Sequence, residues 1–180
     1  MLLSHLDALC RVGLDPELWR FTSSKVATRE DMLEYIETAL QWQRDGTAQP
    51  FVIIEKSSGE IIGSTRYANI DKVNLRLEIG WTWIARAWQR TAINTEMKCL
   101  MLIHAFEKLG CISVELKTNV LNMKSRNAML RIGAKEEGIF RNHLIGKDGA
   151  IRHTAWYSFI KSEWPRVKAH LQELMEQKHS

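Results

Sequence analysis

The sequence predicts a mixed α/β fold in one domain, because strand-type and helix-type patterns alternate along the chain. Residues 51–56 (FVIIEK) and 61–70 (IIGSTRYANI) flank a short Ser/Gly turn, as in a β-hairpin, and residues 75–84 supply a third strand. Residues 93–105 carry apolar side chains at helical spacing and precede a strand-like run at 111–118. A strand, a crossover helix and a second strand of this length usually form a parallel, right-handed unit. The sheet is therefore expected to be mixed.

The first fifty residues are expected to be helical. Leu3, Leu6 and Leu9 share one face of a short helix. The segment 28–31 (TRED) resembles a capping box with Asp in the place of the usual Glu, and the helix that it opens should end at Gly46. No strand pattern precedes these helices.

The C-terminal third continues the alternation. A short helix is expected from Asn122 to Gly133, followed by strands near 138–145 and 151–160 around a Lys147-Asp148-Gly149 turn. A final amphipathic helix should begin around residues 163–165, since proline is tolerated in the first turn of a helix.

Composition limits the possible functions. The chain has 180 residues, 45% apolar and 26% charged, and its 25 basic and 21 acidic residues give a net charge of +4. This suits an anionic small ligand, whereas nucleic-acid binding would need a concentrated basic patch, and none is evident. Three cysteines without metal-type spacing indicate reduced thiols and no metal site. No apolar run is long enough to span a membrane and no export signal is recognisable, so a cytoplasmic protein is expected.

The most informative stretch is 78–96 (EIGWTWIARAWQRTAINTE). Glu78, Gly80, Thr82 and Ile84 would share one face of a strand, which then leads through a basic turn into the helix. A strand that ends at a helix N-terminus is a common phosphate-binding arrangement, because the unpaired N–H groups of the first turn point at the anion.

The string LEIGWTWIARAWQRTAINTEMK (77–98), together with IIGSTRY (61–67) and VELKTNVLNMKSRNAMLRIGAKEEG (114–138), resembles the GCN5-related N-acetyltransferase (GNAT) family, in particular its ribosomal-protein N-terminal acetyltransferase-like branch. The resemblance covers roughly residues 50–160. It implies a mixed, mostly antiparallel central sheet flanked by helices, with the third and fourth strands splayed apart and the usual first strand apparently missing. Residues 1–180 are then expected to form a single acyl-CoA N-acyltransferase domain.

The resemblance implies acetyl-coenzyme A as the acetyl donor. Its pyrophosphate would lie on a loop made of Gln89, Arg90, Thr91, Ala92, Ile93 and Asn94. Its pantetheine arm would follow Trp83 and Ile84, with further contacts from Asn122 and Arg126. The family's loop has small residues where this chain has Ala92 and Asn94; alanine adds only a methyl group, and asparagine tolerates the left-handed backbone region. The alternative interpretation of this loop is an ordinary helix cap.

Two residues are the catalytic candidates. Glu78 would act as general base toward the amine, or alternatively pair with Arg66 or Arg76 across the hairpin. Ser125 would hydrogen-bond the departing sulfur, or alternatively be a solvated residue in a helix that Asn122 caps. Tyr157 is another possible proton donor, although its apolar strand favours a core position. His143 and His153 could border an acceptor pocket, with plain surface histidines as the alternative.

The expected function is transfer of an acetyl group from acetyl-CoA to a primary amine, either a protein N-terminus or a small amine. The alternative is a CoA-binding regulatory or degenerate protein of the same fold without turnover. Acceptor identity is not readable from the sequence. A homodimer is expected from an exposed sheet edge, and no membrane or nucleic-acid partner is expected.

Overall fold

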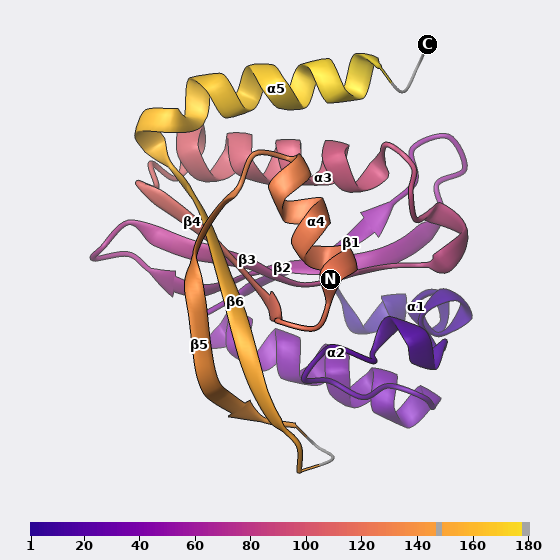
Figure 1. Cartoon of the computed structure of the whole chain (residues 1–180). Coiled ribbons are helices and arrows are strands. Elements are labelled where there is room, and N and C mark those ends of the chain that lie inside the picture. The colour runs from indigo at the N-terminus through magenta and orange to yellow at the C-terminus, as the bar shows by residue number, and fades with distance from the viewer. Residues whose placement is uncertain (147–148, 178–180) are drawn as a thin grey trace. The chain divides into compact units, whose positions relative to one another are not determined.

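The computed structural model describes residues 1–146 and 149–177. It contains a six-stranded sheet in the order β1-β2-β3-β4-β6-β5, flanked by helices (Figure 1). The strands are β1 (Gln49–Ile54), β2 (Ile61–Asp71), β3 (Arg76–Ile84), β4 (Ser113–Asn119), β5 (Lys135–Ile145) and β6 (Ile151–Ile160). The pair β3/β4 is parallel, whereas β1/β2, β4/β6 and β5/β6 are antiparallel. The predicted mixed, mostly antiparallel sheet is confirmed.

The helices agree with the expected order. They are η1 (Leu3–His5), α1 (Leu6–Gly13), η2 (Pro16–Leu18), α2 (Arg29–Arg44), η3 (Arg86–Trp88), α3 (Ile93–Ile103), η4 (His104–Lys108), α4 (Met123–Arg131), η5 (Lys161–Glu163) and α5 (Trp164–Glu176). The capping box is confirmed, since the Thr28 side chain accepts from the Asp31 N–H while the Asp31 carboxylate accepts from the Thr28 N–H. Residues 1–48 contain helices and no strand. Lys147 and Asp148 of the expected turn lie outside the described residues.

The chain groups into two compact units: residues 1–70 with 79–89, and residues 71–78 with 90–180. The strand β3 contributes its first three residues to the second unit and its remainder to the first. Its parallel ladder with β4 comprises three pairs, from Arg76–Ser113 to Glu78–Glu115. The two strands therefore share hydrogen bonds only near their starts, as expected of strands that part.

Aromatic side chains packed against α1 and α2 form the centre of the first unit. Trp83 lies 5.4 Å from Trp19 between ring centroids, and Trp19 meets the Tyr35 ring edge-on at 5.2 Å. Strands β2 and β3 approach closely at Gly63, where an added Cβ would lie 2.2 Å from the Trp83 carbonyl oxygen. The expected alternation along β3 is interrupted at Trp81, whose φ of +50° places it in the left-handed region, as in a β-bulge.

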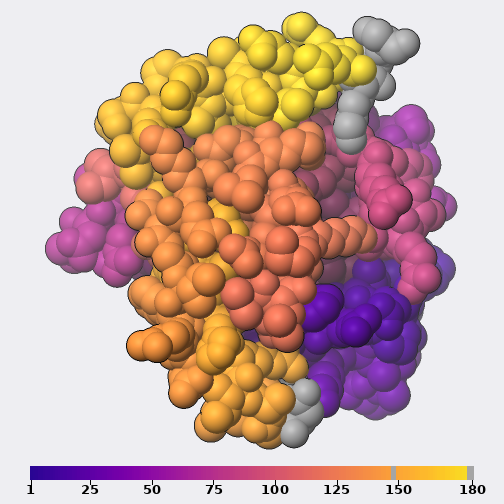
Figure 2. Space-filling model, viewed as in Figure 1, coloured from indigo at the N-terminus to yellow at the C-terminus, as the bar shows by residue number. Residues whose placement is uncertain are grey.

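In the second unit, α5 packs against the end of α3 and η4 and against the end of α4. Phe106, in the π-helical turn η4 after α3, stacks on Trp164 at 5.2 Å, and the Trp164 indole N–H donates to Glu107 at 2.9 Å. The end of α4 also meets α5, since a ring nitrogen of His170 lies 2.8 Å from the Arg131 carbonyl oxygen. Figure 2 shows α5 (yellow) against the adjoining orange surface.

The three cysteines are free thiols distributed over both units. Cys10 lies in the first unit, and Cys99 and Cys111 are buried in the second. Burial raises the pKa of each of these thiols. Among the described helices, none combines the length and the apolar character needed to cross a membrane.

Candidate active site

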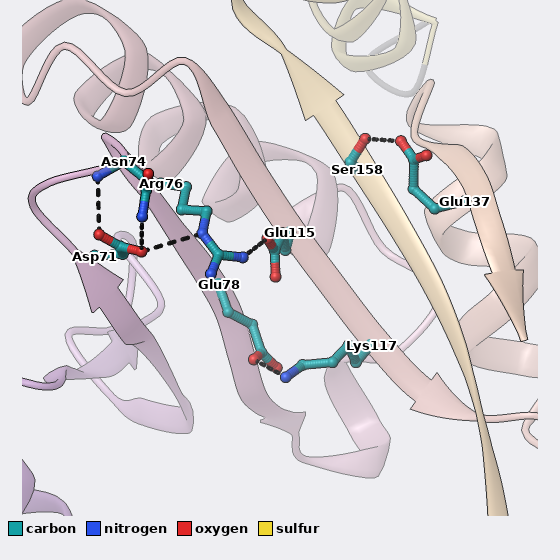
Figure 3. Close-up of polar contacts among 8 residues, drawn as sticks. All are labelled: Asp71, Asn74, Arg76, Glu78, Glu115, Lys117, Glu137 and Ser158. Carbon is teal, nitrogen blue, oxygen red and sulfur yellow. Dashed lines mark hydrogen bonds and ion pairs between the residues drawn. The ribbon is translucent and has the colours of Figure 1, made fainter. Parts of the chain in front are cut away.

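Glu78 is buried at the last pair of the β3/β4 ladder, with only 4% of its surface exposed. Its carboxylate forms an ion pair with Lys117 of β4, with Nζ 2.6 Å from Oε2 (Figure 3). Of the two arginines expected as alternative partners, Arg76 instead pairs with Asp71 at 3.3 Å and with Glu115 at 2.8 Å. The sequence did not indicate Lys117, because the register between parallel strands depends on the crossover that joins them.

A second lysine acts on the same carboxylate. Lys98, on α3, is 6% exposed, and its burial lowers the pKa from 10.5 to about 7, while the charge of Glu78 opposes that shift. Desolvation thus outweighs the attraction to a neighbouring anion. Because Lys98 changes its charge near neutral pH, the electrostatic field at Glu78 changes there as well.

The Lys117 ammonium also lies over an aromatic ring. Its nitrogen is 4.2 Å from the centroid of Trp156, a cation–π distance. The Trp156 ring contacts Phe140 at 4.8 Å and His143 at 5.8 Å. The buried carboxylate is therefore connected through Lys117 and Trp156 to the aromatic side chains of the last hairpin.

That hairpin contains an open hollow within the second unit. It is lined by Phe140, Arg141, Asn142, His143 and His153. A break in the β5/β6 register accompanies the positive φ of Asn142, +51°, and the Asn142 N–H donates to Nδ1 of His153 at 2.8 Å. Nδ1 of His143 lies 2.9 Å from the Thr154 hydroxyl. Both histidines line this hollow, and His143 is exposed, so a role beside an acceptor stays a prediction.

The start of α3 has the features of an anion site. Ala92 is the N-cap and has no side chain to cap the helix, while the Thr91 hydroxyl just before it accepts from the Ile93 N–H at 3.4 Å. The N–H groups of a first helical turn point out of the N-terminus. Arg90, just before, adopts a φ of +64° although it is not glycine. The Gln89 amide donates to the Ile84 carbonyl at 2.8 Å and closes the turn after β3. The loop therefore forms without glycine, and the Ala92 side chain adds only a methyl group to it.

An arginine that sequence reasoning missed lies beside this loop. Arg131, at the end of α4, donates from Nη2 to the Thr95 hydroxyl in the first turn of α3 at 2.8 Å. Its guanidinium adds a positive charge at the first turn of α3. The available signal was an arginine in the last turn of a predicted helix, but nothing in the sequence shows that this helix end meets α3.

The α4 start places two of the expected residues together. The Asn122 side chain accepts from the Ser125 N–H at 3.1 Å, so Asn122 is the N-cap. Ser125 is half-buried, and the described part of the chain offers its hydroxyl no hydrogen-bond partner. The hydroxyl is thus unoccupied by protein groups, as its expected role requires.

Arg126 is engaged in a side-chain network. Its guanidinium donates to the Tyr157 hydroxyl at 2.8 Å and to Glu136 at 2.9 Å, and the Tyr157 hydroxyl also donates to Glu136 at 2.8 Å. These hydrogen bonds lower the pKa of Glu136, with the Arg126 bond the largest cause, while burial raises that of Tyr157. Tyr157 is fully buried, in agreement with the core interpretation. A phosphate contact by Arg126 would have to compete with this network.

The remaining expected contacts lie in the first unit. Trp83 and Ile84 are buried, and the Ile84 carbonyl already accepts from Gln89. Arg66, the other alternative partner for Glu78, is 1% exposed; it donates to the Tyr35 carbonyl at 3.2 Å and its guanidinium lies 4.4 Å from the Tyr35 ring centroid. Its environment is thus a cation–π enclosure, which the sequence did not predict.

Comparison with known proteins identifies the class. The acetyltransferase (GNAT) domain family matches residues 1–135. "Uncharacterized N-acetyltransferase p20" of Bacillus licheniformis is 26% identical over 168 residues, covering 91% of this chain and 92% of that protein. "Putative ribosomal N-acetyltransferase YdaF" of Bacillus subtilis (strain 168) is 36% identical over 110 residues, covering 61% and 59%. A crystal structure of a GCN5-related N-acetyltransferase from Brucella melitensis superposes with a TM-score of 0.87 at 30% identity, covering 96% and 78%.

A sheet with one parallel pair at β3/β4, a helix with an open N-terminus after β3, and a match over three quarters of the sequence together define an acetyltransferase. The chain belongs to the GNAT family. The resemblance found in the sequence is thereby confirmed, and proteins of this family use acetyl-CoA.

Proposed function

We propose that this protein transfers an acetyl group from acetyl-CoA to a primary amine, by direct attack through a tetrahedral intermediate. The observation that supports the proposal is the start of α3, where Ala92 provides no capping side chain and Arg131 adds a positive charge at Thr95 in the first turn. A helix N-terminus with such donors favours a diphosphate. Bound there, acetyl-CoA would supply an activated thioester.

The residues of this chain would then serve the transfer in separate roles. The loop from Gln89 to Asn94 would hold the pyrophosphate, and backbone groups of Trp83 and Ile84 would position the pantetheine arm. Glu78 would take the proton from the attacking amine, directly or through water. A backbone N–H of β3 would stabilise the oxyanion, and the Ser125 hydroxyl would donate a hydrogen bond to the departing sulfur.

The acceptor is proposed to be a protein N-terminus or a small amine. The ribosomal N-acetyltransferase name of one relative supports a protein acceptor. The hollow of the last hairpin, with Phe140, Arg141 and two histidines, offers an aromatic and hydrogen-bonding surface close to Trp156 and Lys117. We include residues 1–180 in this one acetyltransferase domain, since β5 and β6 complete the sheet.

We also propose that two copies associate through the edge strand β5. This strand ends the sheet order, and its Ile139, Phe140, Leu144 and Ile145 are each more than 40% exposed. Unpaired strand edges and exposed apolar side chains both favour association. Light scattering during size-exclusion chromatography would measure the molecular mass of the eluting protein. The mass of a monomer at every concentration would contradict the dimer.

The test of the function is isothermal titration with acetyl-CoA, followed by a screen of amines. Saturable binding to the parent protein is expected, and Ala92→Glu should abolish it because a carboxylate opposes the diphosphate. Gln43→Glu, which adds the same charge to the exposed face of α2, should bind as the parent does. Absence of binding by the parent would rule out the proposal.

A second candidate function is supported by one observation. The family's small loop positions are Ala92 and Asn94 here, and Glu78 already has a partner in Lys117. Both features suit a CoA-binding protein without turnover. Tight binding together with no acetylation of a broad panel of peptides and amines would favour this alternative.

A further inference from the structure

The second unit contains an amine already held against the proposed base. Nζ of Lys117 lies 2.6 Å from Oε2 of Glu78, and the side chains of Lys117 and Glu78 are 19% and 5% exposed. Figure 3 shows the two side chains reaching toward each other from β4 and β3. A general base must lie within hydrogen-bond reach of the amine whose proton it takes. Lys117 therefore occupies the position that the proposed function gives to the acceptor amine.

The position along the strands is consistent with this role. The β3/β4 ladder ends at Glu78 and Glu115, and Lys117 follows two residues later on the same face of β4 as Glu115. The proposed pantetheine contacts, Trp83 and Ile84, continue β3 beyond Glu78.

The ion pair also provides a route to a nucleophilic amine. Transfer of one proton from Nζ to Oε2, 2.6 Å apart, would turn the ammonium into an amine with a lone pair. The face of Trp156, 4.2 Å from the nitrogen, holds the side chain on one side. Lys117 therefore needs no other base and no large rearrangement to present a lone pair.

We propose that Lys117 is a self-acetylation site of this enzyme. Glu78 takes one proton from the ammonium, and the nitrogen lone pair attacks the thioester carbonyl carbon. The N–C bond forms, the C–S bond breaks, and coenzyme A leaves as a thiolate that takes up the surplus proton of the nitrogen. Glu78 returns its proton to water. The product is an uncharged amide, so Glu78 loses the positive charge of Lys117. This inference rests on the proposed function.

The experiment is incubation of the full chain with acetyl-CoA and no added amine, followed by intact-mass measurement and peptide mapping. The wild-type protein should gain one acetyl group, located on Lys117, at a rate per molecule that does not change with protein concentration. Lys117→Arg should gain none at this position, and Glu78→Gln should gain it far more slowly. Lys135→Arg is the matched control, because Lys135 is an exposed lysine paired with a carboxylate, Glu163, and this variant should still be modified at Lys117. Urea-unfolded protein reports the uncatalysed reaction.

The outcomes separate this inference from the proposed function. If the protein binds acetyl-CoA and acetylates added amines while Lys117 stays unmodified, self-acetylation is wrong and the function stands. Modification that appears equally on Lys98, Lys135 and the unfolded chain would also overturn it. If acetyl-CoA does not bind at all, the proposed function fails and the inference fails with it.

Discussion

At the scale of single residues, the proposed chemistry depends most on Glu78. Its neighbours are cationic, since Lys117 forms an ion pair with it and Lys98 is close enough for their charges to interact. In the proposed chemistry this carboxylate takes a proton from an amine beside it. The identity of that amine, a lysine of the chain or an added acceptor, decides which product forms.

Glu78→Gln is expected to lower kcat for amine acetylation by about 10²–10⁴-fold, because a general base contributes on that order. The affinity for acetyl-CoA should be unchanged, since the residue does not belong to the pyrophosphate loop. Glu115→Gln, on the neighbouring strand and paired with Arg76, serves as control and should keep its turnover. A fully active Glu78→Gln protein that remains folded would show that another group takes the proton.

Gly63→Ala is expected to lower the free energy of unfolding by about 1–3 kcal/mol, as overpacking usually does. The new Cβ would lie 2.2 Å from the Trp83 carbonyl oxygen, a backbone atom that cannot rotate away. Urea unfolding measures the loss. Gly59→Asn, at an open turn position with a φ of +71°, should cost less than about 0.5 kcal/mol. Equal stability of both variants would contradict the close approach of β2 and β3.

At the scale of elements, the proposed pyrophosphate site depends on the contact between the start of α3 and the end of α4. The start of α3 provides N–H donors, and the end of α4 brings Arg131 to the Thr95 hydroxyl at 2.8 Å. The C-terminal end of α4 favours a cation such as Arg131, whereas the N-terminus of α3 favours an anion. An anion bound at the start of α3 would interact with both. Both ends of α4, Asn122 at its start and Arg131 at its end, would therefore contribute to the proposed CoA site.

Arg131→Ala is expected to raise the Kd for acetyl-CoA by about tenfold, which corresponds to one charge-assisted hydrogen bond. Part of the salt dependence of binding should disappear with it, because exposed charge interactions are screened by ions. Arg131→Lys keeps the charge and should lose less. Titration at two salt concentrations tests this, and unchanged affinity and salt dependence in Arg131→Ala would exclude the contribution.

The elements themselves were predictable, because each carries a local signal. Alternation and turns predicted the strands, the capping box at Thr28 predicted α2, and the strand–helix–strand order predicted the parallel pair. Contacts between distant segments were not predictable. The Glu78–Lys117 pair depends on strand register, and the Arg131–Thr95 bond depends on how two helices meet. The roles expected for Glu78, Ser125 and the loop remain predictions.

At the scale of the whole molecule, a buried lysine makes stability depend on pH. Burial lowers the pKa of Lys98 to about 7 in the folded protein, against 10.5 as its ordinary value. Between these values the unfolded chain binds more protons than the folded one, so stability rises with pH from about 7 toward 10.5. Below pH 7 the folded protein has to carry the buried charge, and this cost is then fully present.

Lys98→Met is therefore expected to unfold at higher urea concentration than the parent at pH 6, with a gain of about 1–4 kcal/mol, as for other buried charges replaced by apolar side chains. The gain should shrink as the pH rises above 7, because the parent loses the charge there. Lys135→Met, at an exposed lysine, should show no such trend. A gain that is constant from pH 6 to pH 9 would contradict the lowered pKa.

The rates at which a thiol reagent labels the three cysteines would report local opening in the two compact units. Cys10 belongs to one compact unit, while Cys99 and Cys111 belong to the other, and all three have thiol pKa values raised by burial. A thiol-specific reagent reacts with the thiolate, so at neutral pH the buried Cys99 and Cys111 should be labelled mainly while their surroundings are transiently open, whereas the half-buried Cys10 should react faster. Comparing the labelling rate of Cys10 with the rates of Cys99 and Cys111 would show in which unit the cysteine surroundings open more often. Repeating the labelling with acetyl-CoA would show how far the ligand slows each rate.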